Sequence, residues 1–224
     1  MIANKHCPLF ISFEGGEGAG KTTLIHHLQS ELAQLGYSVL KTREPGGTSL
    51  GEKIRQVLLQ QESQVNINSL TEMLLFLAAR SQHIEEVIKP ALVAGKMVLC
   101  DRFNDSTVVY QGIAREIGEE RVLKWCRDIC QEIMPEITLF LDLDPNTGME
   151  RAIKQGRAMD RMEKEQQSFH EKVRQGFLKI AADNPTRVFV IDAHQSSRDV
   201  FEQAKNIILN KLHKKEKATS SQVP

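Results

Sequence analysis

A short segment near the amino terminus combines glycines with a lysine and a threonine at a spacing that suits phosphate binding. It consists of Gly15, Gly16, Glu17, Gly18, Ala19, Gly20, Lys21, Thr22 and Thr23, and it fits G-x-x-x-x-G-K-[ST] at each fixed position. The glycines let backbone N–H groups converge on a phosphate, and Lys21 can reach the β- and γ-phosphates of a nucleotide. The Thr22 hydroxyl is a ligand for Mg²⁺. The segment therefore predicts a nucleoside triphosphate site.

Two other interpretations of these glycines were weighed. A glycine-rich turn could simply connect a strand to a helix, but the apolar run Leu9–Phe13 before it and the helical pattern after it match the context of a phosphate loop. A dinucleotide fingerprint, G-x-G-x-x-G, fails because its third glycine, counted from Gly16, would fall on Lys21.

An acidic residue follows a second apolar run. Met97–Cys100 predicts a buried strand, and Asp101 comes directly after it. Phosphoryl transfer needs a carboxylate near the metal, commonly at the end of a strand next to the phosphate loop. Asp101 and Thr22 are thus the predicted Mg²⁺ ligands, and Arg102 would bring a guanidinium beside them.

Arginines near strand ends indicate a second anion site. Arg43, Arg55, Arg80 and Arg102 follow predicted strands or lie on adjacent helices, where open α/β sheets bind ligands. Most surface arginines are only solvated charges, so position alone distinguishes these four. The segment 151–162 is rich in Arg and Lys around a glycine and is predicted to be a lid that excludes water.

Alternating apolar and amphipathic segments must position these groups. Predicted strands are Leu9–Glu14, Ser38–Thr42, Met97–Asp101, Ile137–Asp142 and Arg187–Ile191; predicted helices are Lys21–Leu35, Leu50–Gln60, Ser69–Ala94 with a break, Glu119–Glu132, Pro145–Gln155, Glu163–Ala182 and Ser197–Leu212. The pattern predicts one α/β domain over residues 1–212, a three-layer P-loop NTPase fold with a parallel sheet of about five strands. Residues 213–224 are predicted to form a polar, flexible tail.

Composition excludes several classes of protein. Among 224 residues, 29 basic side chains balance 29 acidic ones, which argues against nucleic acid as the main partner. No apolar run is long enough for a membrane span or a signal peptide, so no membrane association and a cytoplasmic location are expected. Four cysteines in a chain of this length indicate reduced thiols; Cys126 and Cys130 share a helix face, and buried thiols are favoured over a metal or redox pair.

Five segments carry a resemblance to a known family. F-E-G-G-E-G-A-G-K-T-T (Phe13–Thr23), T-R-E-P-G-G-T (Thr42–Thr48), F-L-A-A-R (Phe76–Arg80), D-R-F-N-D-S-T-V-V-Y-Q-G (Asp101–Gly112) and D-R-M-E (Asp160–Glu163) occur in this order. In these segments the chain resembles the bacterial thymidylate kinases. The resemblance implies transfer of the γ-phosphoryl group of ATP to dTMP with Mg²⁺, in dTTP biosynthesis, by a homodimer.

The resemblance also implies roles for individual residues in binding dTMP. Phe76 would stack on thymine beside Arg80, and their spacing of four places both on one helix face. The residues implied to contact dTMP are Glu17, Arg43, Pro45, Arg55, Phe76, Arg80, Arg102, Ser106, Thr107, Tyr110 and Gln111. Of these, Tyr110 would crowd the sugar C2′ and so favour deoxyribose.

The catalytic cation is implied to come from the lid, because bacterial relatives of this type lack an arginine in the phosphate loop. Related sequences often have Arg directly before the lid glycine, where this chain has Gln155. Lys154, Arg157 and Arg161 therefore remain alternative candidates. Glu163 resembles a family acid near the metal, and a solvated acid at a helix start is the other interpretation.

Two further functions were kept as alternatives. One is a kinase for another nucleoside or nucleotide, such as uridylate. The other is a nucleotide-dependent switch protein, although the N-K-x-D and D-x-x-G motifs of GTPase switches are not found in the sequence.

Overall fold

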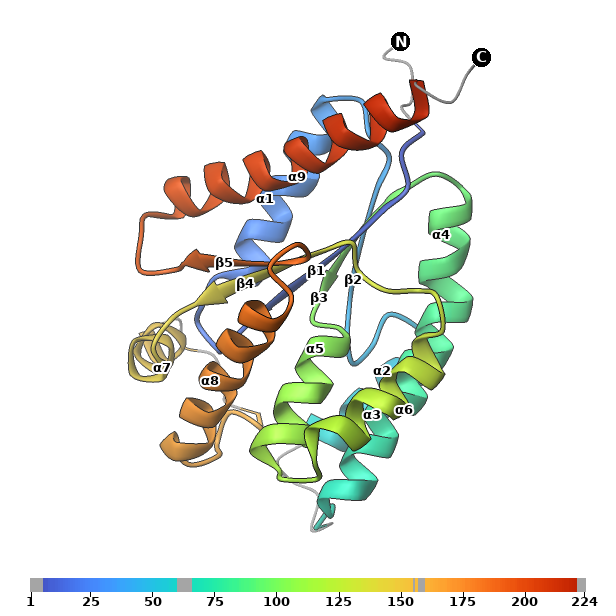
Figure 1. Ribbon diagram of the computed structural model, residues 1–224. Helices are drawn as coiled ribbons and strands as arrows, with labels where there is room; N and C mark the ends of the chain where they lie inside the picture. Colours follow the sequence, from blue (N-terminus) through green and yellow to red (C-terminus); the bar gives the residue numbers. More distant parts are fainter. Residues whose placement is uncertain (1–5, 60–65, 155, 157–159, 221–224) are drawn as a thin grey trace.

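The computed structural model describes residues 6–59, 66–154, 156 and 160–220, and its centre is a five-stranded parallel sheet (Figure 1). The strand order is β2-β3-β1-β4-β5. The strands are β1 (Leu9–Gly15), β2 (Val39–Arg43), β3 (Met97–Asp101), β4 (Ile137–Asp142) and β5 (Val188–Asp192). All five predicted strands are confirmed, with ends that differ by one residue at most.

Burial on both faces explains why these runs are continuously apolar. Every residue of β1 is buried, and its neighbours β3 and β4 hold it in parallel register, with Ile11 opposite Leu99 on one side and Ile137 on the other. A strand covered on both faces has no solvent side, so the period-two alternation disappears. The parallel register places the carboxyl ends of the strands at one edge of the sheet.

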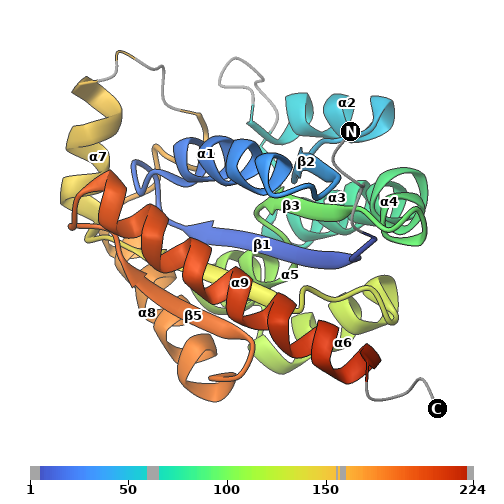
Figure 2. The ribbon, with the colours of Figure 1, turned by 90° about the horizontal axis from the view of Figure 1, so that it is seen from above.

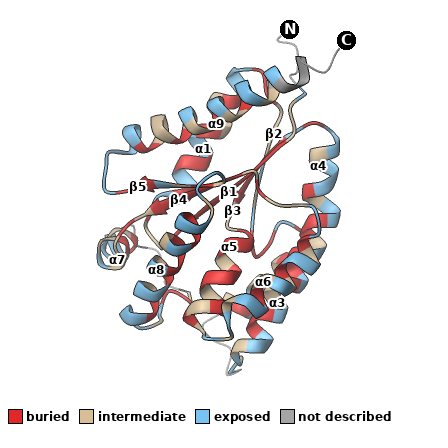
Figure 3. Cartoon of the chain, in the orientation of Figure 1, coloured by how far each residue is buried: buried red, intermediate tan, exposed pale blue. Residues whose placement is uncertain are grey.

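Helices cover both faces of the sheet, which makes the predicted three layers. On one face lie α1 (Lys21–Gln34) and α9 (Ser197–Ser220), whose Leu28 and Ile208 are fully buried in the same cluster as Ile11 (Figure 2). On the other lie α3 (Ser69–His83), α6 (Glu119–Cys130) and α8 (Gln167–Asp183), whose inward sides are buried and outward sides exposed (Figure 3). The remaining helices include α2 (Ser49–Leu59) and α7 (Pro145–Lys154).

The break expected within Ser69–Ala94 is a change of helix type. After α3 the chain continues as a π-helical segment, η1 (Ile84–Ile88), and then as α4 (Lys89–Val93). Pro90 has no N–H, and its ring would crowd the carbonyl of Glu86 in a regular α-helix. A wider π turn before the proline accommodates both effects.

A helical stretch after β3 was not predicted. It comprises α5 (Asn104–Thr107) and the π-helical η2 (Val108–Ala114). Asn and Asp favour turns, and Val108 and Val109 have modest helix propensity, so local sequence argued against a helix. Both valines are fully buried against the second face of the sheet, and this burial overrides local preference.

Two predicted boundaries were wrong. Helix α9 continues to Ser220, eight residues past its predicted end at Leu212, and Lys215 Nζ donates to the carbonyl of Pro8 at 2.8 Å and to Glu136 Oε1 at 2.7 Å. Residues 221–224 lie outside the described residues. Helix α8 begins at Gln167, four residues after the predicted start at Glu163. Among the described helices, none is long and apolar enough to cross a membrane.

Candidate active site

A cavity of about 650 Å³ opens at the carboxyl ends of β1, β2 and β3. It brings together the residues implied to bind dTMP with those of the phosphate loop and the predicted metal site. The predicted residues that line it are Glu17, Lys21, Thr22, Arg43, Pro45, Arg55, Phe76, Arg80, Asp101, Arg102, Ser106, Thr107, Tyr110, Gln111 and Glu163. They come from segments up to 146 positions apart in the chain, Glu17 and Glu163 being the most distant.

The phosphate loop connects β1 to α1, as its sequence context predicts. Lys21 begins α1, and its Nζ donates to the carbonyls of Gly15 at 3.0 Å and Gly16 at 2.8 Å. Burial, together with the neighbouring Arg102 guanidinium, lowers the pKa of Lys21 to about 8. The ammonium therefore lies in a poorly solvated place, where a phosphate would be a strong counterion.

A contact between two glycines seats α7, which leads into the predicted lid, against this loop. A Cβ at Gly18, whose φ is +66°, would lie 2.1 Å from the carbonyl oxygen of Gly148 in α7. In the same contact, a Cβ at Gly148 would lie 2.3 Å from the backbone carbonyl oxygen of Glu17. Both positions need glycine for this approach. Sequence reasoning gave no role to Gly148.

The two predicted metal ligands lie side by side. Thr22 Oγ1 donates to Asp101 Oδ2 at 3.2 Å, across the register in which Phe13 of β1 pairs with Asp101 of β3. A hydroxyl and a carboxylate are hard oxygen ligands of the kind Mg²⁺ prefers, and this ion keeps waters and substrate phosphates as its other ligands. These two residues fit such an ion without a larger protein cage.

Arg102 is held in an unusual backbone conformation beside this pair. Its φ is +67°, and its N–H donates to the carbonyl of Phe13 at 2.9 Å. The guanidinium lies 5.3 Å from the ring centre of Tyr110, and Nη1 donates to Ser106 Oγ at 3.4 Å. Burial disfavours its charge, but Tyr110 and the nearby carboxylates outweigh burial and raise the pKa of Arg102. A permanently charged group thus faces the cavity.

The other predicted phosphate ligands lie on either side of the turn after β2, Arg43 at the end of β2 and Arg55 on α2. The peptide between Glu44 and Pro45 is cis, and Arg55 Nη1 from α2 donates to the Pro45 carbonyl at 2.9 Å. Arg43 Nη2 donates to Glu52 Oε2 at 2.9 Å. Burial and the neighbouring Arg43 lower the pKa of Arg55. Two like charges beside one cavity favour an anion between them.

The base end of the cavity contains Phe76 and Arg80 on α3. Phe76 is half-buried, whereas Arg80 is 2% exposed and its Nε donates to Glu44 Oε2 at 2.7 Å. On η2, Gln111 Nε2 donates to Glu72 Oε1 at 3.0 Å. Each of these polar side chains is therefore oriented by a buried carboxylate that the sequence analysis did not single out.

Glu14 and His83 were also missed. Glu14 is fully buried at the end of β1, accepting hydrogen bonds from the Phe103 backbone at 2.8 Å and Ser106 Oγ at 2.5 Å. Burial, with a contribution from Asp105, raises its pKa to about 7. An acid inside an apolar strand was the available signal for Glu14. Nothing local distinguishes His83.

Glu17 and Glu163 lie next to each other in the cavity. Burial and the proximity of Glu17 raise the pKa of Glu163, as expected when two carboxyl groups share a poorly solvated site. Glu163 Oε2 also accepts a hydrogen bond from the backbone of Asp160 at 2.9 Å. The pair lies on the lid side of the phosphate loop.

The three candidate lid cations have different surroundings. Lys154 is exposed near the end of α7, and Arg157 lies outside the described residues, as does Gln155. Arg161 Nε donates to the carbonyl of Leu58 at 2.8 Å, and its Nη2 to Glu72. Arg161 is thus hydrogen-bonded to α2 and α3. Which of the three cations serves the transition state stays untested.

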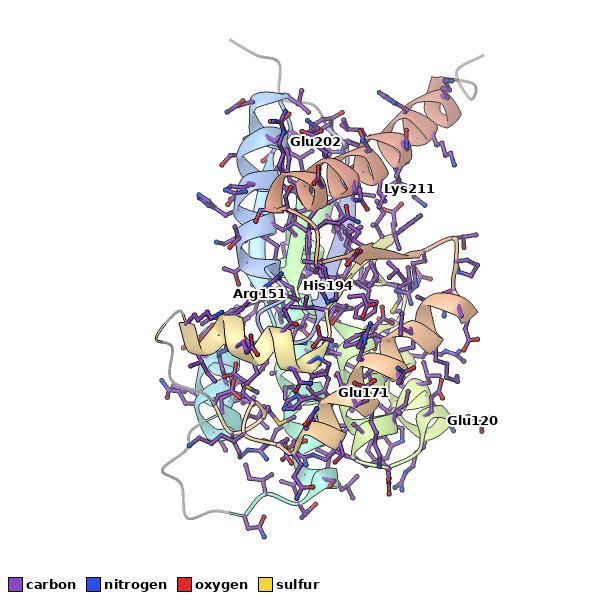
Figure 4. The ribbon with its side chains drawn as sticks, turned by 90° about the vertical axis from the view of Figure 1, so that its left-hand side faces the viewer. Glu120, Arg151, Glu171, His194, Glu202 and Lys211 are labelled. Carbon is purple, nitrogen blue, oxygen red and sulfur yellow. The ribbon has the colours of Figure 1, made fainter. Side chains whose placement is uncertain are left out.

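The first residue of the predicted lid, Arg151 on α7, contacts the loop after β5. Arg151 of α7 and His194 lie close together in Figure 4, and Arg151 Nη1 donates to the carbonyl of Ala193 at 3.0 Å. His194 is paired with Asp144 at 3.0 Å and Asp192 at 2.9 Å. This contact joins the ends of β4 and β5 to the lid helix.

The parallel sheet, the phosphate loop between β1 and α1, and a cavity that runs from that loop to a second group of arginines define the class of P-loop kinases acting on small molecules. Comparison with known sequences narrows this class. The family model described as "Thymidylate kinase" matches residues 13–204. The chain belongs to the thymidylate kinase family.

Individual relatives agree with the family model over nearly the whole chain. The thymidylate kinase of Protochlamydia amoebophila is 49% identical, covering 91% of this chain and 93% of its own. That of Oceanobacillus iheyensis is 44% identical, covering 96% of both chains. A crystal structure of the thymidylate kinase from Ehrlichia chaffeensis superposes with a TM-score of 0.71 at 36% identity, covering 90% of this chain and 98% of the other.

Proposed function

We propose that the protein transfers the γ-phosphoryl group of ATP to dTMP, giving ADP and dTDP. The observation that carries this proposal is that residues of the phosphate loop line the same cavity as Arg80, Arg102 and Tyr110. One end offers Lys21 and the start of α1 to a triphosphate, and the other offers an aromatic ring and guanidinium groups to a nucleoside monophosphate. Membership of the family supports thymine as the base.

The residues act mainly by positioning and by neutralising charge, since phosphoryl transfer needs little covalent help from a protein. Lys21 would hold the β- and γ-phosphates of ATP, and Arg55 and Arg102 would hold the phosphate of dTMP. Buried cations in a poorly solvated cavity interact with the spreading negative charge of the transition state more strongly than they would in water. The two phosphates are thereby brought together despite their mutual repulsion.

Mg²⁺ is part of the proposal, with Thr22 and Asp101 as its protein ligands. Their oxygens are 3.2 Å apart and lie beside the phosphate loop. When bound, the ion neutralises phosphate charge. Glu163 is a further candidate because its carboxyl group lies beside Glu17 within the same cavity.

Selection of thymidylate would come from the base and sugar ends of the cavity. Phe76 lies where it can stack on a base, and Arg80 lies where it can donate to a base carbonyl. Tyr110 is wedged between Arg102 and Phe169, with ring centres of Tyr110 and Phe169 6.0 Å apart, so it has little freedom to move away from a ribose 2′-hydroxyl.

We also propose that two copies associate through α2 and α3. Leu50, Val57, Leu70 and Leu74 on these helices are 40–49% exposed, which is high for large apolar side chains on two neighbouring helices. A Leu74→Glu substitution should then yield a monomer in sedimentation, whereas Val93→Glu on α4, where the valine is 78% exposed, should not change the assembly. A monomeric wild-type protein at micromolar concentration would contradict this. A cytoplasmic location stays a prediction from the sequence.

The experiment that tests the activity is a coupled assay of ADP release with ATP, Mg²⁺ and a panel of dTMP, dUMP, UMP and dCMP. Fast release with dTMP, well above all others, is the expected result. Faster ADP release with UMP than with dTMP would contradict the proposal and favour a uridylate kinase. Slow hydrolysis that is equal with every acceptor would overturn it in favour of a nucleotide switch.

A further inference from the structure

Four polar side chains, three of them buried and one, Thr42, half-buried, form a continuous chain of hydrogen bonds behind the base end of the cavity. Thr42 Oγ1 on β2 pairs with His83 Nε2 at 2.6 Å, and His83 Nδ1 pairs with Glu44 Oε1 at 2.9 Å. The other oxygen of Glu44 accepts from Arg80 Nε at 2.7 Å. His83 and Arg80 are three residues apart and so project from the same face of α3.

Burial makes each contact in this chain necessary. His83 is 0% exposed, Arg80 2% and Glu44 5%, so an unpaired polar atom here could not turn to solvent. Both oxygens of the Glu44 carboxylate are used, one by the imidazole and one by the guanidinium. Without the imidazole, the carboxylate could rotate about its last bond, and the Arg80 plane would keep only its contacts with the Phe103 ring, at 4.9 Å, and with Cys126 Sγ.

The same imidazole contacts the turn that lies between Arg43 and Arg55, two of the residues proposed to hold the acceptor phosphate. A Cβ placed on Gly47 would lie 2.5 Å from His83 Nε2, so ring and turn are in close contact. Within that turn, Glu44 donates its N–H to the Asp101 carbonyl at 2.9 Å, and the Pro45 carbonyl accepts from Arg55. His83 therefore joins helix α3 to the turn after β2.

We propose that His83 is a positioning residue for the acceptor nucleotide, which sets the direction of Arg80 through Glu44 and holds the Glu44–Gly47 turn in place. The ionised Glu44 carboxylate can only accept, so the tautomer that satisfies this contact carries its proton on Nδ1 and donates it to Glu44. The inference rests on the proposed function, because it assigns Arg80 to the base of the acceptor.

Two amide substitutions test the two ring nitrogens of His83 separately. In His83→Asn the side-chain amide nitrogen can occupy the place of Nδ1 and still donate to Glu44. In His83→Gln the amide nitrogen reaches the place of Nε2, and the donor to Glu44 is lost. His26→Gln, on the exposed surface of α1, is the matched control.

The expected result is a selective loss on the acceptor side. His83→Gln should raise the KM for dTMP about 10- to 100-fold, the factor for an unsatisfied buried carboxylate partner, and should narrow the ratio of kcat/KM between dTMP and dCMP. The KM for ATP should change less than about twofold, because the phosphate loop is independent of this chain of bonds. His83→Asn should recover most of the dTMP affinity, and the control should match the wild-type protein.

Several results would overturn the inference. Equal losses in the Asn and Gln variants, or a parallel rise of both KM values, would mean that His83 contributes only to packing. If His83→Gln does not fold, Thr42→Val provides the second measurement, since it removes the contact that holds the ring to β2. We then expect a higher KM for dTMP and weaker base selection in Thr42→Val; unchanged values for both, together with a normal circular dichroism spectrum, would overturn the inference. A wild-type protein that prefers another nucleotide would refute the proposed function instead, and the same variants would be compared on that nucleotide.

Discussion

The backbone N–H of Phe103 donates to Oε1 of Glu14 over 2.8 Å, although the two residues are 89 positions apart in the chain. The other oxygen of Glu14 accepts from Ser106 Oγ at 2.5 Å. Glu14 immediately precedes the phosphate loop, and Phe103 immediately follows Arg102. One buried carboxylate therefore fixes the distance between the ATP side and the acceptor side of the cavity.

Replacing Glu14 with Gln should impair acceptor binding. Glutamine replaces one of the two carboxylate oxygens with an NH₂ donor, so one of the two positions that accept from Phe103 and Ser106 is lost, and Arg102 would lose its fixed position. We expect the KM for dTMP to rise about tenfold, equivalent to one weakened buried hydrogen bond, in steady-state assays. Glu120→Gln, a change at an exposed position on α6, is the control. An unchanged KM would show that Glu14 does not position Arg102.

The same substitution should change how stability depends on pH. The folded-state pKa of Glu14 is about 7, above its ordinary 4.5, so the folded protein holds this proton more tightly than the unfolded chain. The stabilisation is complete below pH 4.5 and is lost as the pH rises through 7. The free energy of unfolding of Glu14→Gln relative to wild type should therefore increase between pH 5 and 7.5, by up to about 3 kcal/mol. Urea unfolding of both proteins at pH 5 and pH 7.5 measures this difference. If the free energies of unfolding of the two proteins change equally with pH, the raised pKa of Glu14 is contradicted.

Lys21 should set the alkaline limit of ATP use. Its pKa is lowered to about 8, and only the ammonium form can hold phosphates, so kcat/KM for ATP should fall above pH 8. Lys21→Met should reduce kcat by about a hundredfold or more while the protein stays folded. Lys89→Met on α4, which removes an exposed charge paired with Glu85, should have no effect. Retained turnover in Lys21→Met would remove the phosphate loop from the mechanism.

Asp101→Asn should weaken the response to Mg²⁺. An amide lacks the negative charge that attracts the ion beside Thr22, so the Mg²⁺ concentration for half-maximal activity should rise about tenfold or more. The measurement is a Mg²⁺ titration of activity at saturating ATP and dTMP. Asp183→Asn, near the exposed end of α8, is the matched variant. The same half-maximal concentration in both variants would argue against a metal at Asp101.

Arg187→Met should destabilise the protein without touching the cavity. Arg187 pairs with buried Asp105 at 2.7 Å and with Thr138 at 2.8 Å, and its removal leaves the carboxylate without its cation, at a cost of about 3 kcal/mol or more. Lys179→Met breaks an exposed pair with Glu119 and should cost less than about 1 kcal/mol. Chemical denaturation compares the two. Equal effects would indicate that Asp105 is better solvated than its 4% exposure suggests.

The sequence alone determined the features that are encoded by residues close together in the chain. The phosphate loop is one contiguous segment, and the buried strands are continuous apolar runs, so Lys21, Thr22 and Asp101 could be found from spacing and from their place at strand ends. Resemblance then gave the acceptor residues, from Phe76 to Gln111, and these line the same cavity as the loop.

Only the tertiary structure decided which buried groups hold those residues in place. Glu14 meets Ser106 across 92 positions, and His83 meets Glu44 across 39, through contacts that no local pattern encodes. The helix at Asn104–Ala114 likewise forms against local preference, because packing on the sheet outweighs helix propensity. The extension of α9 to Ser220 agrees with the helix propensity of its Lys, Glu and Ala residues, and Lys215 joins it to Pro8 and Glu136. Local spacing specifies which chemical group stands at each position, whereas buried contacts between distant segments specify how that side chain is oriented.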